Sequence, residues 1–167
     1  QFFLGDNDFA LMKKLRDAGT DHRKFMRMLT VYVDITAPLY WWKEFDTYKV
    51  GTVANSCSTM HKIHAKEFIL DDFSHEHLVW EAKDFLCVMV GYLNSCRENY
   101  LANKDKKWWW QMIQLLPTSY NQKRTVQLNY QVLKSMYFAR KTHKLDEWHT
   151  FCAWCETLPM FKELVLG

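Results

Sequence analysis

The stretch "FMRMLTVYVDITAPLYWWKEF", residues 25–45, carries the clearest structural signal in the chain. From Phe25 to Thr36 apolar residues alternate with others, interrupted at Arg27, and this period of two predicts a β-strand. Pro38 then suits the first turn of a helix, which we expect to continue through "LYWWKEFDTYK" to Gly51. A strand followed at once by a helix indicates a mixed fold.

Helical periodicity dominates the rest of the chain. We expect Asp6 or Asp8 to cap a first helix and Ser74 to cap a long one. The apolar face of the long helix is predicted to hold Leu78, Ala82, Phe85, Leu86, Met89 and Leu93. Further helices are predicted at 108–116, at 121–141 and after Asp146, where Trp148, Cys152 and Cys155 share one side. The predicted fold class is helix-rich α+β.

Composition limits the classes of protein that fit. The chain has 167 residues, 49% of them hydrophobic, which predicts one domain over 1–167 with its own core. A charge of +3, with basic residues scattered among acids, argues against duplex nucleic acid, and no apolar run is long enough for a membrane span. Five cysteines without a signal peptide predict reduced thiols and a cytoplasmic location. Because residue 1 is Gln, we keep open a missing N-terminal segment.

Three local patterns have a structural and a chemical interpretation. "CAWC" at 152–155 has no second cysteine pair for zinc, so packing is favoured over metal or redox chemistry. The seven histidines form no H-E-x-x-H pattern, and no metal site is expected. The tryptophans at 108–110 could stack on bases, but core and interface burial is favoured.

One longer pattern resembles a known family. The order of "DH" at 21–22, the strand, the helix and "NSCSTMH" at 55–61 is similar to the flavin-dependent thymidylate synthases, the ThyX family. The chain most resembles the short ThyX-like proteins of bacteriophages, which share the "STMH" motif and a motif similar to the "LDEW" at 145–148. Where the family has Arg-His-Arg, then Ser, Asn-Glu, Ser and Arg-Tyr, this chain has Thr47, Tyr48, Lys49, Thr52, Asn55, Ser58, Met60 and His61.

The resemblance implies a fold, ligands and site residues. The fold would contain a small, mostly antiparallel sheet. The protein would be a homotetramer with shared sites for dUMP, FAD, NADPH and methylenetetrahydrofolate. Asn129 and Arg140 stand at the family's eleven-residue interval, and His22 stands where the family has a histidine before its strand. The implied nucleotide-binding residues are Arg140, Asn129, Ser58, Lys49, His61 and His22; no catalytic residue is identified.

The substitutions suggest altered chemistry. Thr47, Tyr48 and Met60 replace charged or imidazole side chains of the family motif, and only Lys49 keeps a charge among those four positions. We therefore expect weakened FAD binding and a divergent ThyX-like protein that binds a dUMP-like pyrimidine nucleotide, with its flavin chemistry altered or lost. Two alternatives remain: a phage protein in a bacterial host that sequesters nucleotides or serves assembly or host interaction, and an active FAD-dependent thymidylate synthase that methylates dUMP.

Several of these residues have simpler interpretations. Ser58 and Thr59 could cap nearby backbone groups, and His61 could be an exposed imidazole. Arg140 could be a favourable cation at the C-terminal end of its helix. The aromatic load at Trp41, Trp42 and 108–110 exceeds what one small domain readily buries, and predicts a homo-oligomer.

Overall fold

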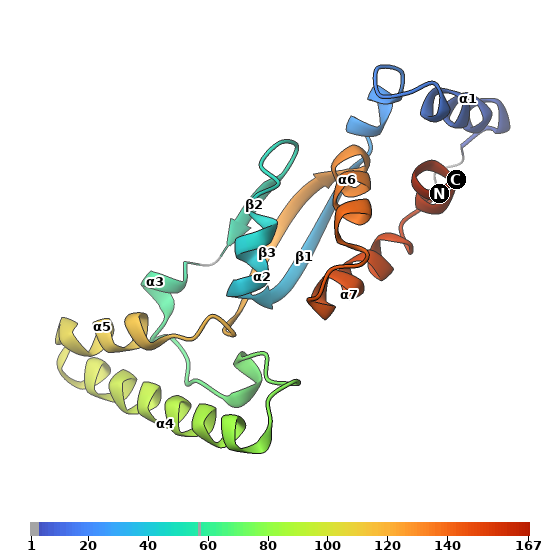
Figure 1. Ribbon diagram of the computed structural model, residues 1–167. Coiled ribbons are helices and arrows are strands. Elements are labelled where there is room, and N and C mark those ends of the chain that lie inside the picture. Colours follow the sequence, from blue (N-terminus) through green and yellow to red (C-terminus); the bar gives the residue numbers. More distant parts are fainter. Residues whose placement is uncertain (1–3, 57) are drawn as a thin grey trace. The chain divides into compact units, whose positions relative to one another are not determined.

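Three antiparallel strands form the sheet of the protein, in the order β1-β3-β2 (Figure 1). The computed structural model describes residues 4–56 and 58–167. The strands are β1 (Thr30–Pro38), β2 (Val53–Ser56) and β3 (Asn121–Asn129). Helices make up most of the remaining chain, which confirms the predicted helix-rich α+β class.

β1 confirms only part of the predicted strand. From Thr30 onward, exposed and less exposed side chains alternate, as the sequence pattern required. Residues Arg23–Arg27 instead form a short 3₁₀ helix, in which Met26 is completely buried. Arg27 and Met28 are both exposed, so the alternation of the sequence is broken at the point where Arg27 interrupts it.

The helix after β1 is shorter than predicted. Pro38 is the last residue of the strand, and α2 (Leu39–Phe45) ends well before Gly51. Trp41 and Trp42 are each 1% exposed, and the indole Nε1 of Trp42 donates a 2.9 Å hydrogen bond to the carbonyl of Gln122. Both tryptophans are therefore buried within one chain, and they lend no support to an oligomer.

The chain divides into two compact units, which are described separately. Unit 1 consists of Gln1–Val33, Asp46–Ala54 and Thr125–Gly167. Unit 2 consists of Asp34–Phe45 and Asn55–Arg124. The single domain expected from chain length stays a prediction.

Unit 1 is built around two packed helices, α6 (Tyr130–Arg140) and α7 (Asp146–Cys155). α1 (Asp6–Asp17) and a π-helical turn (Lys162–Leu166) complete it. As predicted, the α7 side chains Trp148, Cys152 and Cys155 are buried together. The caps differ from prediction, since Gly5 and Leu145 precede α1 and α7 in place of the aspartates.

The single helix predicted at 121–141 is wrong in its first half. Residues Asn121–Asn129 form β3, in which Val126 and Leu128, two positions apart, are both fully buried. A spacing of two is the period of a strand, whereas the predicted helix rested on Val126 and Tyr130, whose spacing of four fits a helix face and one side of a strand alike. Asn129 ends the strand and caps α6, because its side-chain oxygen accepts a 3.0 Å hydrogen bond from the Val132 N–H.

Unit 2 contains the longest helix, α4 (Trp80–Asn103), with α5 (Lys106–Leu115) beside it (Figure 1). A four-residue helix, α3 (Thr59–Lys62), and a 3₁₀ turn (Leu70–Asp72) lie in the segment before them. The core of this unit contains Ile63, Phe68, Phe73, Leu86, Leu93, Cys96 and Met112.

α4 starts later than predicted and faces the core differently. Its N-cap is Val79, and Ser74 instead forms a 3.0 Å side-chain hydrogen bond with Asn121. Leu93 is fully buried as expected, whereas Phe85 is 68% exposed, so the predicted apolar face is wrong at that position. The tryptophan triplet lies at the margin of this core: Trp108 and Trp109 are half-buried and pack against it, whereas Trp110 is 44% exposed.

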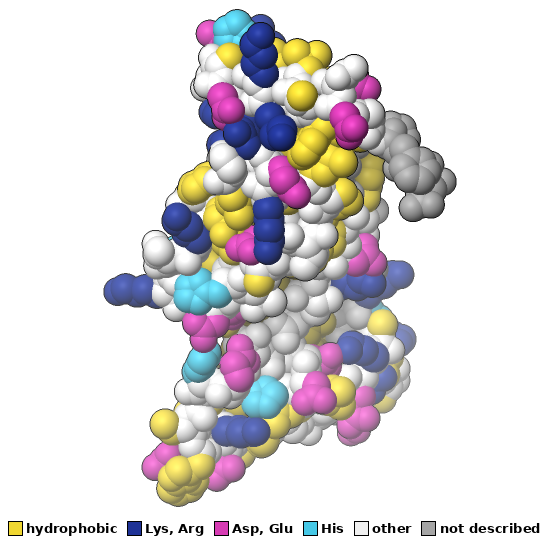
Figure 2. Space-filling model, turned by 90° about the vertical axis from the view of Figure 1, so that its right-hand side faces the viewer, with side chains coloured by type: hydrophobic (Ala, Val, Ile, Leu, Met, Phe, Trp, Pro, Cys, Tyr) yellow, Lys and Arg dark blue, Asp and Glu magenta, His cyan; other side chains and the backbone are white. Residues whose placement is uncertain are grey.

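The surface offers no large area of one charge sign on the face shown in Figure 2, where basic and acidic side chains are interspersed with hydrophobic ones. Across residues 4–56 and 58–167, the helices are too short or too polar to traverse a bilayer.

Candidate functional site

A pocket of about 500 Å³ in unit 1 brings together two of the predicted nucleotide-binding residues, Lys49 and Asn129. One wall is the segment from Thr47 to Gly51, and the other is the beginning of α6. Its lining consists of Arg27, Thr47, Tyr48, Lys49, Val50, Gly51, Asn129, Gln131, Val132 and Ser135. A segment predicted as helix has thus become one wall of a cavity.

Gly51 and Asn129 fix the shape of this pocket. Gly51 has a φ of 80°, a left-handed conformation that strains other residues. A Cβ atom at this position would lie 2.8 Å from the Asn129 side-chain nitrogen, which is too close. Since Asn129 also caps α6, the loop passes close to the helix start at a position where only glycine leaves room for the cap.

The charged groups of the pocket are cationic. Arg27 and Lys49 are exposed, and none of the described lining residues is acidic. Thr47, Gln131 and Ser135 add uncharged hydrogen-bonding groups, while Val50 and Val132 add apolar surface. Two cations beside polar donors and an apolar wall suit a small organic anion.

Arg140 lies at the last position of α6, beyond the pocket lining. Its Nε donates a 2.9 Å hydrogen bond to the hydroxyl of Tyr48, which does line the pocket. The guanidinium carbon is 5.0 Å from the centre of the Trp148 ring and 5.5 Å from that of Tyr48, within cation–π range. Direct contact between Arg140 and a ligand stays a prediction; the structure connects Arg140 to the pocket through Tyr48.

Neither of the two predicted histidines lines this pocket. His22 is exposed and precedes the 3₁₀ helix Arg23–Arg27 without a side-chain cap hydrogen bond. His61 is exposed on α3 in unit 2. Neither side chain lines the pocket, and their ligand contacts remain predictions.

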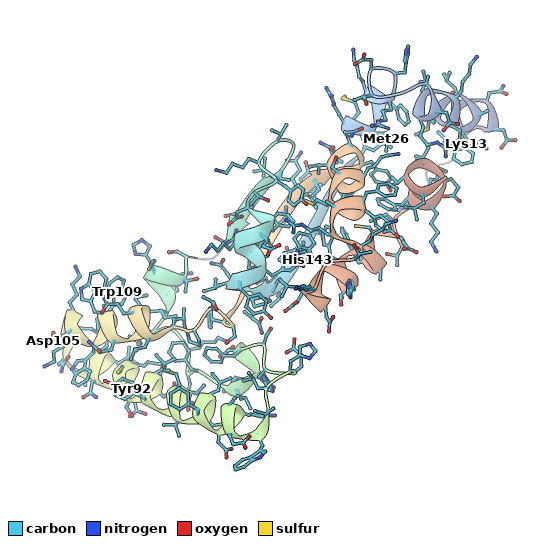
Figure 3. All side chains as sticks on the ribbon, in the orientation of Figure 1. Lys13, Met26, Tyr92, Asp105, Trp109 and His143 are labelled. Carbon is cyan, nitrogen blue, oxygen red and sulfur yellow. The ribbon has the colours of Figure 1, made fainter. Side chains whose placement is uncertain are left out.

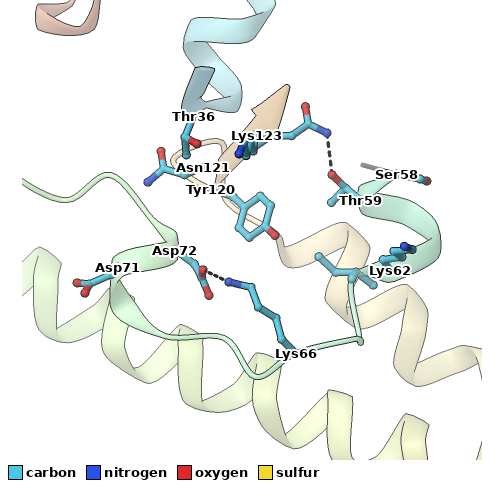
Figure 4. Close-up of a pocket in the computed structure, with 12 residues that line it drawn as sticks. Thr36, Ser58, Thr59, Lys62, Lys66, Asp71, Asp72, Tyr120, Asn121 and Lys123 are labelled. Atoms are coloured by element: carbon cyan, nitrogen blue, oxygen red, sulfur yellow. Dashed lines mark hydrogen bonds and ion pairs between the residues drawn. The ribbon is translucent and has the colours of Figure 1, made fainter. Parts of the chain in front are cut away.

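Ser58 lies in a second pocket, of about 300 Å³, in unit 2 (Figure 4). It caps α3, since its hydroxyl accepts a 3.3 Å hydrogen bond from the His61 N–H. The neighbouring hydroxyl of Thr59 accepts a 2.9 Å hydrogen bond from Gln122. The capping interpretation of Ser58 is therefore observed, while a ligand contact stays a prediction. Cys57, at the centre of "NSCSTMH", lies outside the described residues.

Two of the three lysines that line this second pocket, Lys66 and Lys123, are paired with acids, whereas no such pair is described for Lys62. Lys66 pairs with Asp72, and this hydrogen bond raises the pKa of Lys66 (Figure 4). Lys123 lies 2.7 Å from a carboxylate oxygen of Asp34. An anionic ligand would have to compete with these carboxylates, so the unit 1 pocket is the better candidate for an anion.

Sequence reasoning missed three polar lining residues, Arg27, Gln131 and Ser135, and the two valines Val50 and Val132. Arg27 did carry a signal, since it interrupts an otherwise apolar row of the predicted strand. Gln131 and Ser135 are four residues apart, which is the spacing of neighbours on one helix face. Without the correct start of α6, this spacing could not be linked to the loop.

The cysteine pair does not form a reactive site. Cys152 and Cys155 are buried, and burial raises the pKa of both thiols. Among the residues that the structure describes, no group of three or more His, Cys, Asp or Glu side chains could hold a metal ion.

Solved structures of other proteins share this fold. Two crystal structures of flavin-dependent thymidylate synthase ThyX from Helicobacter pylori, each with FAD and dUMP, align with 96% of this chain. The chain has a ThyX-like fold. The TM-scores are 0.69 and 0.74, at 16% and 15% identity, over 83% and 82% of those chains. No family model and no curated protein matches the sequence.

At such identities the likeness concerns the fold, and it agrees with the resemblance seen in the sequence. The unit 1 pocket is formed by the 47–51 segment, the start of α6 and Arg27 of the 3₁₀ helix. Which ligand the pocket takes is a separate question.

Proposed function

We propose that this protein binds a pyrimidine nucleoside monophosphate, of the dUMP type, in the unit 1 pocket. The proposal rests on one observation: two cations, Arg27 and Lys49, line the same pocket, and its described lining holds no acid. Lys49 and Asn129 were predicted from sequence as nucleotide-binding residues, and both line this pocket. The two similar solved structures contain dUMP, which supports a nucleotide of this class.

The chemistry of a monophosphate matches the lining. A phosphate would pair with Arg27 and Lys49, and the guanidinium can offer two parallel N–H groups to two oxygens. A pyrimidine base needs an apolar or aromatic face and a few amide or hydroxyl partners at its edge. Val132 and the Tyr48 ring offer the first, and Gln131 offers an amide.

Normal flavin binding is not part of the proposal, because the residues present do not fit a flavin diphosphate well. At the positions matched to the family's charged motif, Tyr48 accepts the Arg140 hydrogen bond and Thr47 is uncharged. Met60, at another of these positions, is 53% exposed and apolar. Lys49 alone supplies a charge there, so we derive no flavin-dependent step and propose that this chemistry is altered or lost.

Isothermal titration calorimetry with dUMP tests the proposal. Arg27→Ala should weaken dUMP binding by about tenfold or more, because it removes a charged hydrogen bond to phosphate. Lys24→Ala is the matched control: Lys24 is an exposed cation on the same 3₁₀ helix but does not line the pocket. If both variants lost the same dUMP affinity, the loss would come from the change in net charge, and the pocket would not be the binding site.

The absorption spectrum and a mononucleotide panel separate the remaining alternatives. A purified protein with a flavin band that converts dUMP would establish the active thymidylate synthase. A colourless protein that binds no pyrimidine nucleotide would support an assembly or host-interaction protein that keeps only the fold. The proposed nucleotide binder is colourless and gains thermal stability with dUMP.

Two further expectations belong to this proposal. We propose that the protein is a homo-oligomer, with the tetramer implied by the resemblance as its expected form. We also propose a cytoplasmic location, in a bacterial host if the gene is phage-encoded.

A further inference from the structure

The turn between α4 and α5 carries lysines and aromatic rings in close association. We call this region the Lys/Trp surface; it consists of Tyr100, Lys104, Lys106, Lys107, Trp108, Trp109 and Trp110. Figure 3 shows Trp109 and Asp105 at this end of the two helices. The proposed nucleotide pocket uses none of these residues.

Each lysine of the surface lies over an aromatic ring. The ammonium of Lys106 is 5.8 Å from the centre of the Trp110 ring, and that of Lys107 is 5.2 Å from Trp108. Lys104 lies 5.5 Å from the Tyr100 ring. These exposed contacts are individually weak, so a lysine can leave its ring at little cost.

One acidic side chain, Asp105, lies within the surface. It caps α5 by accepting a 3.0 Å hydrogen bond from the Lys107 N–H, and it also pairs with the Lys107 ammonium at 3.2 Å; both contacts lower the pKa of Asp105. The carboxylate therefore stays charged at neutral pH. Three lysines and one aspartate leave a local charge of 3 − 1 = +2 beside the rings.

The tryptophans differ in how far they are available. The Trp109 indole N–H donates a 2.9 Å hydrogen bond to the Met60 carbonyl, which anchors that ring. Trp110 is 44% exposed, and its ring meets Trp109 edge to face at 4.8 Å. A rigid anchored ring thus supports a second ring that is open to a partner.

We propose that the Lys/Trp surface binds single-stranded nucleic acid. A base would stack on the Trp110 ring, and Lys106 would turn from its ring to a flanking phosphate. Lys107 would exchange its exposed ion pair with Asp105, which contributes little in water, for a second phosphate. Aromatic stacking combined with nearby cations is the usual means of binding single strands without strong sequence preference. A duplex is a poorer partner, because its bases are already stacked on each other.

A lipid surface fits these residues less well. Insertion into a bilayer needs strongly exposed apolar side chains, whereas Trp110 is less than half exposed and lies beneath a lysine. Within α4, the side chains that meet that requirement are at other positions, as with Trp80 at 72% and Val88 at 70% exposure.

Fluorescence anisotropy with a labelled oligo-dT of about 15 nucleotides tests the inference. Trp110→Ala should weaken binding at least about fivefold, the effect expected from losing one stacked base. The double variant Lys106→Gln, Lys107→Gln should reduce the slope of log affinity against log salt by about 1.4, or about 0.7 for each phosphate contact. Circular dichroism melts verify that each variant is folded.

Matched controls are available in unit 2. Trp80→Ala removes another exposed tryptophan, and Lys43→Gln removes another exposed cation; both should leave oligo-dT binding unchanged. Excess dUMP should not displace the oligonucleotide. Failure to bind, displacement by dUMP, equal loss in the controls, or binding only to phosphatidylserine vesicles would each overturn the inference.

Discussion

The Arg140 guanidinium donates a 2.9 Å hydrogen bond from Nε to the hydroxyl of Tyr48, a residue 92 positions earlier in the chain. This contact links the end of α6 to the loop that forms the other wall of the proposed nucleotide pocket. Arg140 is half-buried and also faces the Trp148 ring. The pair offers a means to decide whether Arg140 binds the nucleotide or positions Tyr48.

Arg140→Ala should weaken dUMP binding by about tenfold or more, measured by titration calorimetry. If Arg140 acts by positioning Tyr48, Tyr48→Phe should produce a similar loss, and the double variant should be no weaker than either single one. Additive losses would instead show that Arg140 contacts the ligand by itself. Unchanged affinity in Arg140→Ala would exclude both roles.

The contact between Tyr137 and Glu156 predicts a pH-dependent stability. The Tyr137 hydroxyl donates a 2.6 Å hydrogen bond to Glu156, which raises the pKa of Tyr137 to about 12 and lowers the pKa of Glu156. The contribution of Tyr137 to the free energy of unfolding is complete below the ordinary tyrosine pKa of 10, and it is lost as the pH rises towards 12. The glutamate contribution is present above its ordinary pKa of 4.5 and is lost as the pH falls through its lowered value.

Tyr137→Phe should therefore be less stable than the parent at neutral pH, and the difference should shrink in both acid and strong alkali. Urea unfolding midpoints at about pH 7, pH 3 and pH 11 measure this. Lys162→Gln is a useful control, because Lys162 pairs with Glu156 at 3.4 Å and its removal leaves the Tyr137 hydroxyl in place. It should leave the alkaline behaviour intact. A constant difference at all three pH values would contradict the assignment.

Thiol reactivity should follow burial among the described cysteines. Cys87 is exposed and should react readily with iodoacetamide, whereas Cys96, Cys152 and Cys155 should react only after unfolding. Burial raises the pKa of each of these three thiols and so disfavours the reactive thiolate. Peptide mass spectrometry after timed labelling gives the result directly. Fast labelling of Cys155 in the folded protein would be inconsistent with the buried pair.

Leu93 and Phe85 were expected on the same apolar face of α4, but they should respond differently to truncation. Leu93→Ala should reduce the free energy of unfolding by about 2 to 5 kcal/mol, since Leu93 is fully buried in the core of unit 2. Phe85→Ala should stay within about 0.5 kcal/mol in the monomer, since Phe85 is 68% exposed. Chemical denaturation of both variants provides the comparison; equal losses would refute the observed orientation of α4.

The proposed oligomer has a testable surface on the same helix. Phe85, Val88 and Tyr92 are 68%, 70% and 46% exposed at positions that share a helix face. Multi-angle light scattering should show an oligomer at micromolar concentration, and Val88→Asp should dissociate it if this face is covered by another copy. A monomeric parent protein would reject the oligomer itself.

Predictions from the sequence were correct where the spacing of apolar residues was compatible with only one type of secondary structure. The alternation from Thr30 to Thr36 fixed β1, and the i, i+4, i+7 pattern of Trp148, Cys152 and Cys155 fixed the buried side of α7. The prediction failed at Val126, because its spacing of four from Tyr130 fits one face of a helix as well as one side of a strand that runs into a helix.

The candidate site was predictable only in part. Lys49 and Asn129 came from the resemblance and meet in one pocket, but composition and spacing alone named neither. Arg27 could not be placed, because the 3₁₀ helix that carries it depends on the burial of Met26, a tertiary contact with no periodic signal. Local sequence describes elements, whereas a pocket depends on how distant segments meet.

Gly51 makes the pocket suitable for altered specificity. Its left-handed backbone and its close approach to Asn129 fix the curve of the loop, whereas Thr47, Lys49 and Val50 have exposed side chains. A combinatorial library at these three positions could therefore exchange the recognition chemistry while the scaffold of loop and helix is kept. The same separation would allow the recognition chemistry of such a pocket to change while its cavity is kept.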